Sequence, residues 1–125
     1  MTSQSISQVV AIVDDDRSVQ SAVKDLMESA ALSARCFGSA EEFLESDERN
    51  QTTFLVADIR MPGMSGLELQ AKLKAEGSRI PIVFITARGD GQMKIQAMEA
   101  GAVAFLSKPF DDEVLLEKVR AVLKG

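Results

Sequence analysis

The chain of 125 residues contains no histidine and only one cysteine, Cys36. Without histidine, chemistry that needs an imidazole must take it from a partner protein or use another base. A single cysteine excludes a disulfide within the chain, which is typical of proteins from a reducing cytoplasm. We therefore interpret Cys36 as a small buried apolar residue without a redox role.

Long apolar runs and an excess of positive charge are also missing. Residues 1–8 are polar and suggest a loose lead-in, because a signal peptide needs a basic start and an apolar stretch. No apolar run approaches the roughly 20 residues that span a bilayer, so we expect no membrane association. The net charge of −5 argues against direct nucleic acid binding, since phosphates attract basic surfaces. These features together favour a cytoplasmic location.

The residues that are present have a globular composition, with 46% apolar and 26% charged residues, and the length suits one domain over residues 1–125. Short apolar runs typical of buried strands alternate with segments whose apolar residues recur at helical spacing. The strands are expected at residues 9–13, 32–37, 54–57, 80–86 and 102–106. Five such β-α units predict an α/β fold, with a parallel sheet covered by helices on both faces.

The expected helices have recognisable starts and stops. Helical spacing runs from residue 19 to 30, Ser-x-x-Glu capping boxes at 39–42 and 65–68 open two more helices, a fourth ends at Gly101, and Asp111 or Asp112 caps the last. Residues 46–52 are expected to form a loop and residues 89–91 a flexible turn.

Polar side chains gather where four of the strands end. Residues 14–16 are three aspartates after the first strand, Asp58 follows the third, Thr86 ends the fourth and Lys108 follows the fifth. Each alone has a structural explanation, because acids cap helices, threonine suits strands and lysine lies at surfaces. Since the carboxyl ends of parallel strands share one edge, we expect these groups to meet. Crowded carboxylates would be neutralised by a hard cation such as Mg²⁺, and the hydroxyl and ammonium would complete a phosphoryl site.

Four motifs in this order make the chain resemble the response-regulator receiver domains of two-component signalling. They are IVDDD at residues 12–16, DIRMPGMSG at 58–66, FITA at 84–87 and AFLSKPF at 104–110. The resemblance covers about residues 9–123 and is strongest to the FixJ-like (NarL/LuxR-type) group. It implies the CheY-like (flavodoxin-like) fold, in which five parallel strands have the order 2-1-3-4-5 and five helices cover both faces.

The resemblance also implies roles for individual residues. Asp58 matches the phospho-accepting carboxylate, and Phe105 occupies the aromatic switch position. Thr86 matches the hydroxyl that binds phosphate and reports its presence, while Lys108 matches the lysine that pairs with phosphoryl oxygens. The implied ligands of Mg²⁺, or of Mn²⁺ in its place, are Asp15, Asp58 and the backbone carbonyl of Arg60, with Asp14 reaching the metal through water. Pro109 matches a proline that usually follows a cis peptide bond.

The implied function is that of a signalling switch rather than an enzyme with a separate substrate. Asp58 would take a phosphoryl group from the phosphohistidine of a sensor kinase, which agrees with the missing histidine. Phosphorylation would then remodel the surface of the fourth helix, fifth strand and fifth helix. FixJ-like receivers usually precede a DNA-binding helix-turn-helix domain, so such an output domain beyond residue 125 and a phosphorylation-dependent homodimer are implied.

Other interpretations start from the same acids. Asp14-x-Asp16 resembles the nucleophile and general acid of haloacid-dehalogenase-type phosphohydrolases, although Ser18 only partly replaces the usual threonine. A free-standing receiver acting by protein contact is another alternative, as is a receiver fold that binds partners without taking up phosphate. The complete set of acids and lysine argues against this last interpretation.

Overall fold

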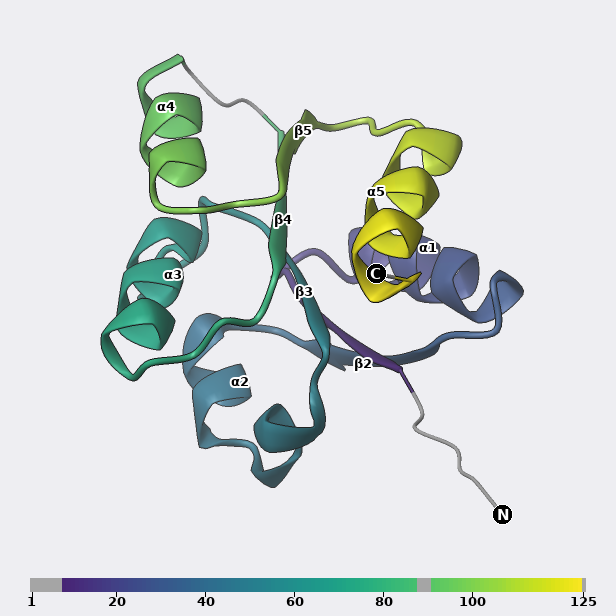
Figure 1. Ribbon diagram of the computed structural model, residues 1–125, viewed down its shortest axis with the longest axis horizontal. Coiled ribbons are helices and arrows are strands. Elements are labelled where there is room, and N and C mark those ends of the chain that lie inside the picture. Colours follow the sequence, from purple (N-terminus) through teal and green to yellow (C-terminus); the bar gives the residue numbers. More distant parts are fainter. Residues whose placement is uncertain (1–7, 88–90, 125) are drawn as a thin grey trace.

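The computed structural model describes residues 8–87 and 91–124, and its centre is a five-stranded parallel sheet of order β2-β1-β3-β4-β5 (Figure 1). The strands are β1 (Val9–Val13), β2 (Ser33–Phe37), β3 (Phe54–Ala57), β4 (Ile82–Thr86) and β5 (Ala104–Ser107). The helices are α1 (Arg17–Ser29), α2 (Ala40–Glu45), the 3₁₀ helix η1 (Asp47–Gln51), α3 (Gly66–Ala75), α4 (Gly91–Glu99) and α5 (Asp112–Lys124). The predicted fold class and strand order are therefore confirmed.

The sheet separates two layers of helices, as Figure 1 shows: α2, α3 and α4 cover one face, and α1 and α5 cover the other. Side chains of β1 point alternately to the two faces of the sheet and so contribute to both hydrophobic cores. Ala11 and Val13 pack under the first layer, while Val10 and Ile12 pack under the second. Strands β3 and β4 are buried along their whole length, as continuous apolar runs predict. None of the helices in the described residues is long and apolar enough to cross a membrane.

The helix starts follow the sequence with one exception. The capping box of α3 is complete, since Ser65 accepts from the Glu68 N–H and Glu68 accepts from the Ser65 N–H. At α2 only half of the box forms, because the Glu42 carboxylate accepts from the Gly38 N–H rather than from Ser39. Of the two candidates for α5, Asp111 is the cap, as its side chain accepts from two backbone N–H groups of the first turn.

Several predicted boundaries were wrong, for local reasons. Strand β4 begins at Ile82 rather than residue 80, because Pro81 has no N–H to donate to the sheet. Strand β5 begins at Ala104 rather than residue 102, because the Ala102 N–H returns to the Ala97 carbonyl and closes α4.

Two segments expected to be irregular contain helix. Within residues 46–52, Ser46 accepts from the Glu48 N–H and caps η1. Gly91 is the first residue of α4, where a helix needs no intrahelical N–H bond. The other residues of the expected turn at 89–91, and residues 1–7 of the expected lead-in, lie outside the described part of the chain.

Candidate functional site

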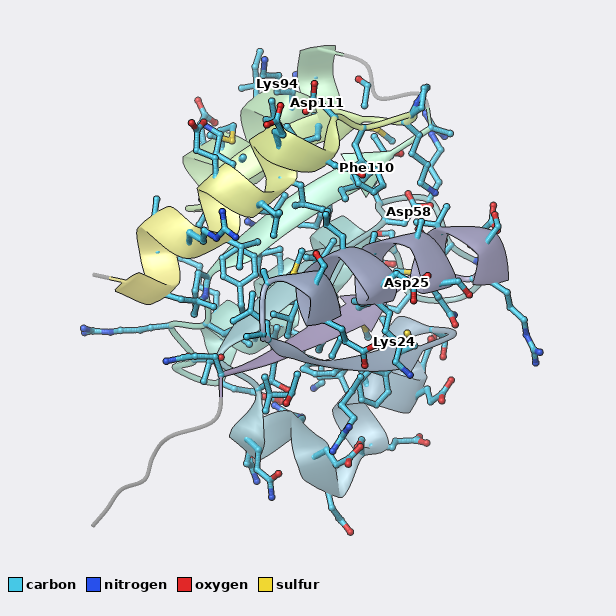
Figure 2. The ribbon with its side chains drawn as sticks, turned by 90° about the vertical axis from the view of Figure 1, so that its right-hand side faces the viewer. Lys24, Asp25, Asp58, Lys94, Phe110 and Asp111 are labelled. Atoms are coloured by element: carbon cyan, nitrogen blue, oxygen red, sulfur yellow. The ribbon has the colours of Figure 1, made fainter. Side chains whose placement is uncertain are left out.

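Asp14 and Asp58 lie side by side at the carboxyl edge of the sheet. Val13 of β1 pairs with Ala57 of β3, and the ladder continues one step further through the bond from the Asp58 N–H to the Val13 carbonyl, 3.0 Å. The parallel register therefore delivers the next residue of each strand to the same place. Figure 2 shows Asp58 at this edge, close to the start of α1.

The carboxylates of Asp14, Asp15 and Asp58 form a compact acidic cluster. One oxygen from each lies within 4.8 Å of the others. Asp14 and Asp58 are only 2% and 6% exposed, whereas Asp15 is exposed to solvent. Two buried carboxylates at this separation repel each other, so the site favours a positive group between them.

Lys108 supplies that positive group in the structure. Its Nζ lies 2.9 Å from Asp58 Oδ2 and 3.0 Å from Asp14 Oδ2. Burial opposes the charged form of Lys108, but its bonds to Asp58 and Asp14 prevail and raise the pKa of the ammonium. Burial raises the pKa of Asp14, and the Asp16 N–H and Lys108 act against that change.

The loop after β5 brings Lys108 to the acids. Its backbone N–H donates to the Thr86 carbonyl at 2.9 Å, which continues the pairing of β4 with β5 past the end of the strand. The Lys108–Pro109 peptide bond is cis, which confirms the prediction for Pro109.

The loop between β3 and α3 is folded back tightly against Asp58. Asp58 Oδ1 accepts from the Arg60 N–H at 3.2 Å, and the Gly66 N–H donates to the Ile59 carbonyl at 2.8 Å. A Cβ on Gly66 would lie 2.3 Å from the Asp58 carbonyl oxygen, so only glycine permits this approach. Met61 and Met64 pack against the core and shape the loop, in agreement with their apolar character.

Thr86 and Phe105 lie on the neighbouring strands β4 and β5. Thr86 is fully buried, and its Oγ1 has no hydrogen-bond partner among the residues that the structure describes. A buried hydroxyl without a partner is costly, and a functional role is one reason for which proteins keep such a group. Phe105 pairs with Phe84 in the sheet and is half-buried against the core beneath α2, α3 and α4.

The donor set of the acidic cluster fits a hard divalent cation. Carboxylate oxygens are the ligands that Mg²⁺ prefers, and it commonly uses one or two of them while keeping water molecules. The buried pair of acids supplies the negative charge, and exposed Asp15 keeps one side open to solvent. The cysteine lies apart from this set, half-buried on β2, and burial raises the pKa of the Cys36 thiol, in keeping with an unreactive residue.

Asp16 has a structural role that the phosphohydrolase interpretation does not allow for. Its carboxylate accepts from the Ser18 N–H at 2.9 Å and from the Ser18 hydroxyl, and so caps α1. It lies outside the cluster of Asp14, Asp15 and Asp58 that the described residues form. This capping role accounts for Asp16 without a part in catalysis.

Gln20, which no motif of the sequence singles out, supports the acidic cluster from α1. The Gln20 amide donates to the carbonyl oxygens of Asp14 and Phe37, and so joins the ends of β1 and β2. Its sequence position, beside the apolar Val19 on an amphipathic helix, carries no signal for such a contact. Only the packing of α1 on the sheet brings it there.

Comparison with known proteins agrees with this geometry. The sequence model of the family described as "Response regulator receiver domain" matches residues 10–120. The response regulator protein TodT of Pseudomonas putida is 47% identical over 118 residues, which are 94% of this chain and 52% of TodT. The transcriptional regulatory protein FixJ of Azorhizobium caulinodans is 40% identical over 114 residues, 91% of this chain and 54% of FixJ.

A solved structure agrees as well. The response regulator StyR superposes with a TM-score of 0.84 at 47% identity, covering 92% of this chain and 58% of StyR. The chain thus spans about half the length of the relatives that it matches. With the family's pattern matched over nearly the whole sequence and the fold in agreement, the chain belongs to the response regulator receiver domain family.

Proposed function

We propose that the chain is a phospho-accepting switch in which Asp58 takes a phosphoryl group from the phosphohistidine of a sensor kinase. The observation that carries this proposal is the pair of buried acids, Asp14 and Asp58, joined by the Lys108 ammonium at the carboxyl edge of the sheet. A structural ion pair would need one acid, whereas the site buries two and keeps a third, Asp15, beside them. In this proposal the protein catalyses its own phosphorylation and dephosphorylation but is a signalling protein rather than an enzyme.

The chemistry follows from the state of the Asp58 carboxylate. A carboxylate attacks without a general base, because it is already anionic. One oxygen of Asp58 forms the new bond to phosphorus while the bond from phosphorus to the imidazole nitrogen breaks, and the nitrogen keeps the electron pair. The Arg60 N–H fixes Asp58 Oδ1, and Lys108 contacts Oδ2, where its charge also stabilises the oxygens of an arriving phosphoryl group.

We infer that Mg²⁺, or Mn²⁺ in its place, is the cofactor. Asp15, Asp58 and the Arg60 backbone carbonyl would hold it, and Asp14 would reach it through water. When bound, it supplies positive charge that offsets the repulsion between the carboxylates and the phosphoryl oxygens. Asp14 and Asp58 provide the low-dielectric part of this site, because both are almost completely buried.

A labelling experiment tests the central proposal. The protein is incubated with a small phosphodonor such as acetyl phosphate, with and without Mg²⁺, and the modified residue is located by mass spectrometry. We expect Mg²⁺-dependent modification of Asp58 alone. Modification of Asp14 would favour a phosphohydrolase-like reaction, and no modification in any condition would favour a module that only binds partners.

Thr86 is proposed to report the phosphoryl group to the rest of the domain. A phosphoryl group adds roughly −1.5 to −2 units of charge and new acceptor oxygens. The buried Thr86 hydroxyl, which has no partner in the described residues, would donate to one of them. Its movement toward Asp58 would leave space for the Phe105 ring to turn inward and remodel the surface of α4, β5 and α5.

Thr86→Val tests this role, because we expect it to stabilise the protein and to weaken its response to phosphorylation. Removing a buried hydroxyl without a partner should raise the free energy of unfolding of the unphosphorylated protein by about 1 kcal/mol. Urea unfolding followed by circular dichroism measures this change. In the phosphorylated state, the NMR shifts of amides around Phe105 should stay close to those of the unphosphorylated protein.

Thr86→Ser is the matched control for that variant, because it keeps the hydroxyl and loses only the methyl group. It should lose stability and keep the phosphorylation-dependent shifts around Phe105. A Thr86→Val protein that responds to phosphorylation like the wild type would remove Thr86 from the switch.

We propose that this receiver, a single domain over residues 1–125, acts within a longer cytoplasmic regulator. The relatives are about twice as long, and FixJ is described as a transcriptional regulatory protein. An output domain with a helix-turn-helix would then bind DNA, while the receiver itself contacts no nucleic acid and no membrane.

Exposed apolar side chains on α4 and α5, namely Ile95, Met98 and Val114, support a phosphorylation-dependent homodimer through this surface. Size measurements with and without phosphorylation test the dimer.

A further inference from the structure

Glu41 connects α2 to the loop that follows Asp58. The Glu41 carboxylate Oε2 accepts from the Met64 N–H at 2.9 Å, across 23 positions of sequence. It lies in the first turn of α2, and its side chain is otherwise directed toward solvent. A bond from a charged acceptor to a backbone N–H is stronger than one between neutral groups, so this contact holds the loop more firmly than an ordinary loop bond.

Gly63 makes room for the same carboxylate. Its φ is +77°, a conformation that side chains disfavour, and a Cβ at this position would lie 2.6 Å from Glu41 Oε2. The Glu41 carboxylate therefore lies close to the Cα of Gly63. It accepts from the N–H of Met64, the residue after Gly63, and not from a backbone group of α2. This fit involves two residues from distant parts of the chain and is independent of the acids at the sheet edge.

The other contacts of the loop are hydrogen bonds near its two ends and the packing of Met61 and Met64 against the core. At its start the Arg60 N–H donates to Asp58, and at its end the Gly66 N–H donates to the Ile59 carbonyl. Between these points Pro62 has no N–H, the Met64 N–H is bonded to Glu41, and the Ser65 N–H donates to Glu68 within the capping box. The contact from α2 thus adds a hydrogen bond from a distant part of the chain to the segment between the two ends of the loop.

We propose that Glu41 is a positioning residue for phosphoryl acceptance: by holding the loop between β3 and α3, it keeps the Arg60 carbonyl and the Asp58 carboxylate arranged for a divalent cation. The inference rests on the proposed function, since it gives Arg60 and Asp58 the roles assigned there. Residues that do not touch a metal but hold its ligands in place orient the groups that bind it. Their loss commonly weakens metal binding about 10–100-fold.

Glu42 offers a matched control within the same helical turn. It carries the same charge, and its carboxylate also accepts from one backbone N–H, that of Gly38 at 2.8 Å. Gly38 belongs to the connection between β2 and α2, so this bond does not hold the loop after Asp58. Removing either glutamate changes the net charge equally, and only the removal of Glu41 releases Met64.

The experiment compares Glu41→Ala, Glu41→Gln and Glu42→Ala with the wild type. The dissociation constant of Mg²⁺ is measured by NMR titration of the amides of residues 58–66, and the rate of labelling by acetyl phosphate is measured at low and saturating Mg²⁺. We expect Glu41→Ala to raise the dissociation constant about tenfold, the lower end of that range. Its labelling should be slow at low Mg²⁺ and recover toward the wild-type rate at saturating Mg²⁺.

The two other variants separate positioning from charge. Glu41→Gln keeps an oxygen that can accept from the Met64 N–H, so most of the Mg²⁺ affinity should return. Glu42→Ala should stay within about twofold of the wild type, because it leaves the loop after Asp58 untouched. Equal losses in Glu41→Ala and Glu42→Ala, or no loss in Glu41→Ala, would overturn the proposal.

A double-mutant cycle with Gly63→Ala tests the contact directly. In the wild-type background the new methyl group displaces the Glu41 carboxylate, and it also strains the backbone at positive φ. The backbone strain is the same in the Glu41→Ala background, so the cycle cancels it. The effect of Gly63→Ala on Mg²⁺ affinity should therefore be smaller when Glu41 is already alanine. Additive effects would show that the carboxylate does not act through this loop.

The wild-type protein distinguishes failure of this inference from failure of the proposed function. If the wild type binds Mg²⁺ and is labelled at Asp58, while Glu41→Ala behaves identically, the role of Glu41 is refuted and the proposed function stands. If the wild type is neither labelled nor binds Mg²⁺, the proposed function fails and the inference fails with it.

Discussion

Asp58→Asn is expected to abolish phosphoryl labelling of the chain completely. The amide that replaces the carboxylate is neutral and a poor nucleophile, so no acyl phosphate forms at this position. The substitution keeps the size of the side chain and the acceptor oxygen that bonds the Arg60 N–H. It also removes one of two buried negative charges that repel each other, while Lys108 retains its ion pair with Asp14. We therefore expect a folded protein that takes up no phosphoryl group.

The measurement is the stoichiometry of labelling by acetyl phosphate in saturating Mg²⁺, with circular dichroism as the check on folding. Asp14→Asn serves as the matched control, since it neutralises the other buried acid of the same ion pair. That variant should be labelled more slowly than the wild type and still at Asp58. Undiminished labelling of Asp58→Asn, or complete loss only in Asp14→Asn, would transfer the nucleophile to another aspartate.

The fold and the meeting of the acids could be predicted because they depend on local patterns. Five apolar runs alternate with helical spacing, and parallel strands bring their carboxyl ends to one edge. The residue that follows a strand is therefore located as soon as the strand is recognised. Asp14 follows Val13 and Asp58 follows Ala57, and these two strand residues pair in the sheet.

The side chains that support the site could not be predicted in this way. Gln20 bonds the Phe37 carbonyl, 17 positions away, and Glu41 bonds the Met64 N–H, 23 positions away. Neither residue stands out from the other polar residues of its helix in the sequence. Their contacts follow from how helices pack on the sheet, which no short-range pattern encodes. The half-formed capping box at Ser39 has a local cause instead, because Glu42 bonds the N–H of Gly38, only four residues before it.

Lys108→Ala is expected to slow phosphorylation without weakening metal binding. Lys108 and a divalent cation neutralise the same two carboxylates, Asp14 and Asp58, so they compete electrostatically. Without the lysine, Mg²⁺ affinity should stay unchanged or increase. The labelling rate should fall about 10²–10³-fold, as for the loss of one group that stabilises charge in a transition state.

The stability of the same variant should depend on Mg²⁺. Loss of a cation from a fully buried pair costs about 3–5 kcal/mol, and we expect the cost to be somewhat lower, about 2–3 kcal/mol, because the Lys108 side chain is 16% exposed. Mg²⁺ should restore much of this loss, since a ligand that binds only the folded state stabilises it. Urea unfolding with and without Mg²⁺ measures both quantities.

Two control variants complete this test of Lys108. Lys108→Met keeps most of the side-chain length and should behave like the alanine variant if charge is what matters. Lys94→Ala removes a lysine that is exposed on α4 (Figure 2) and should change neither stability nor labelling. If Lys108→Ala lost Mg²⁺ affinity in step with its labelling rate, the lysine would act by shaping the acidic cluster. A labelling rate that falls while Mg²⁺ affinity is kept would show that the charge of Lys108 acts on the phosphoryl oxygens.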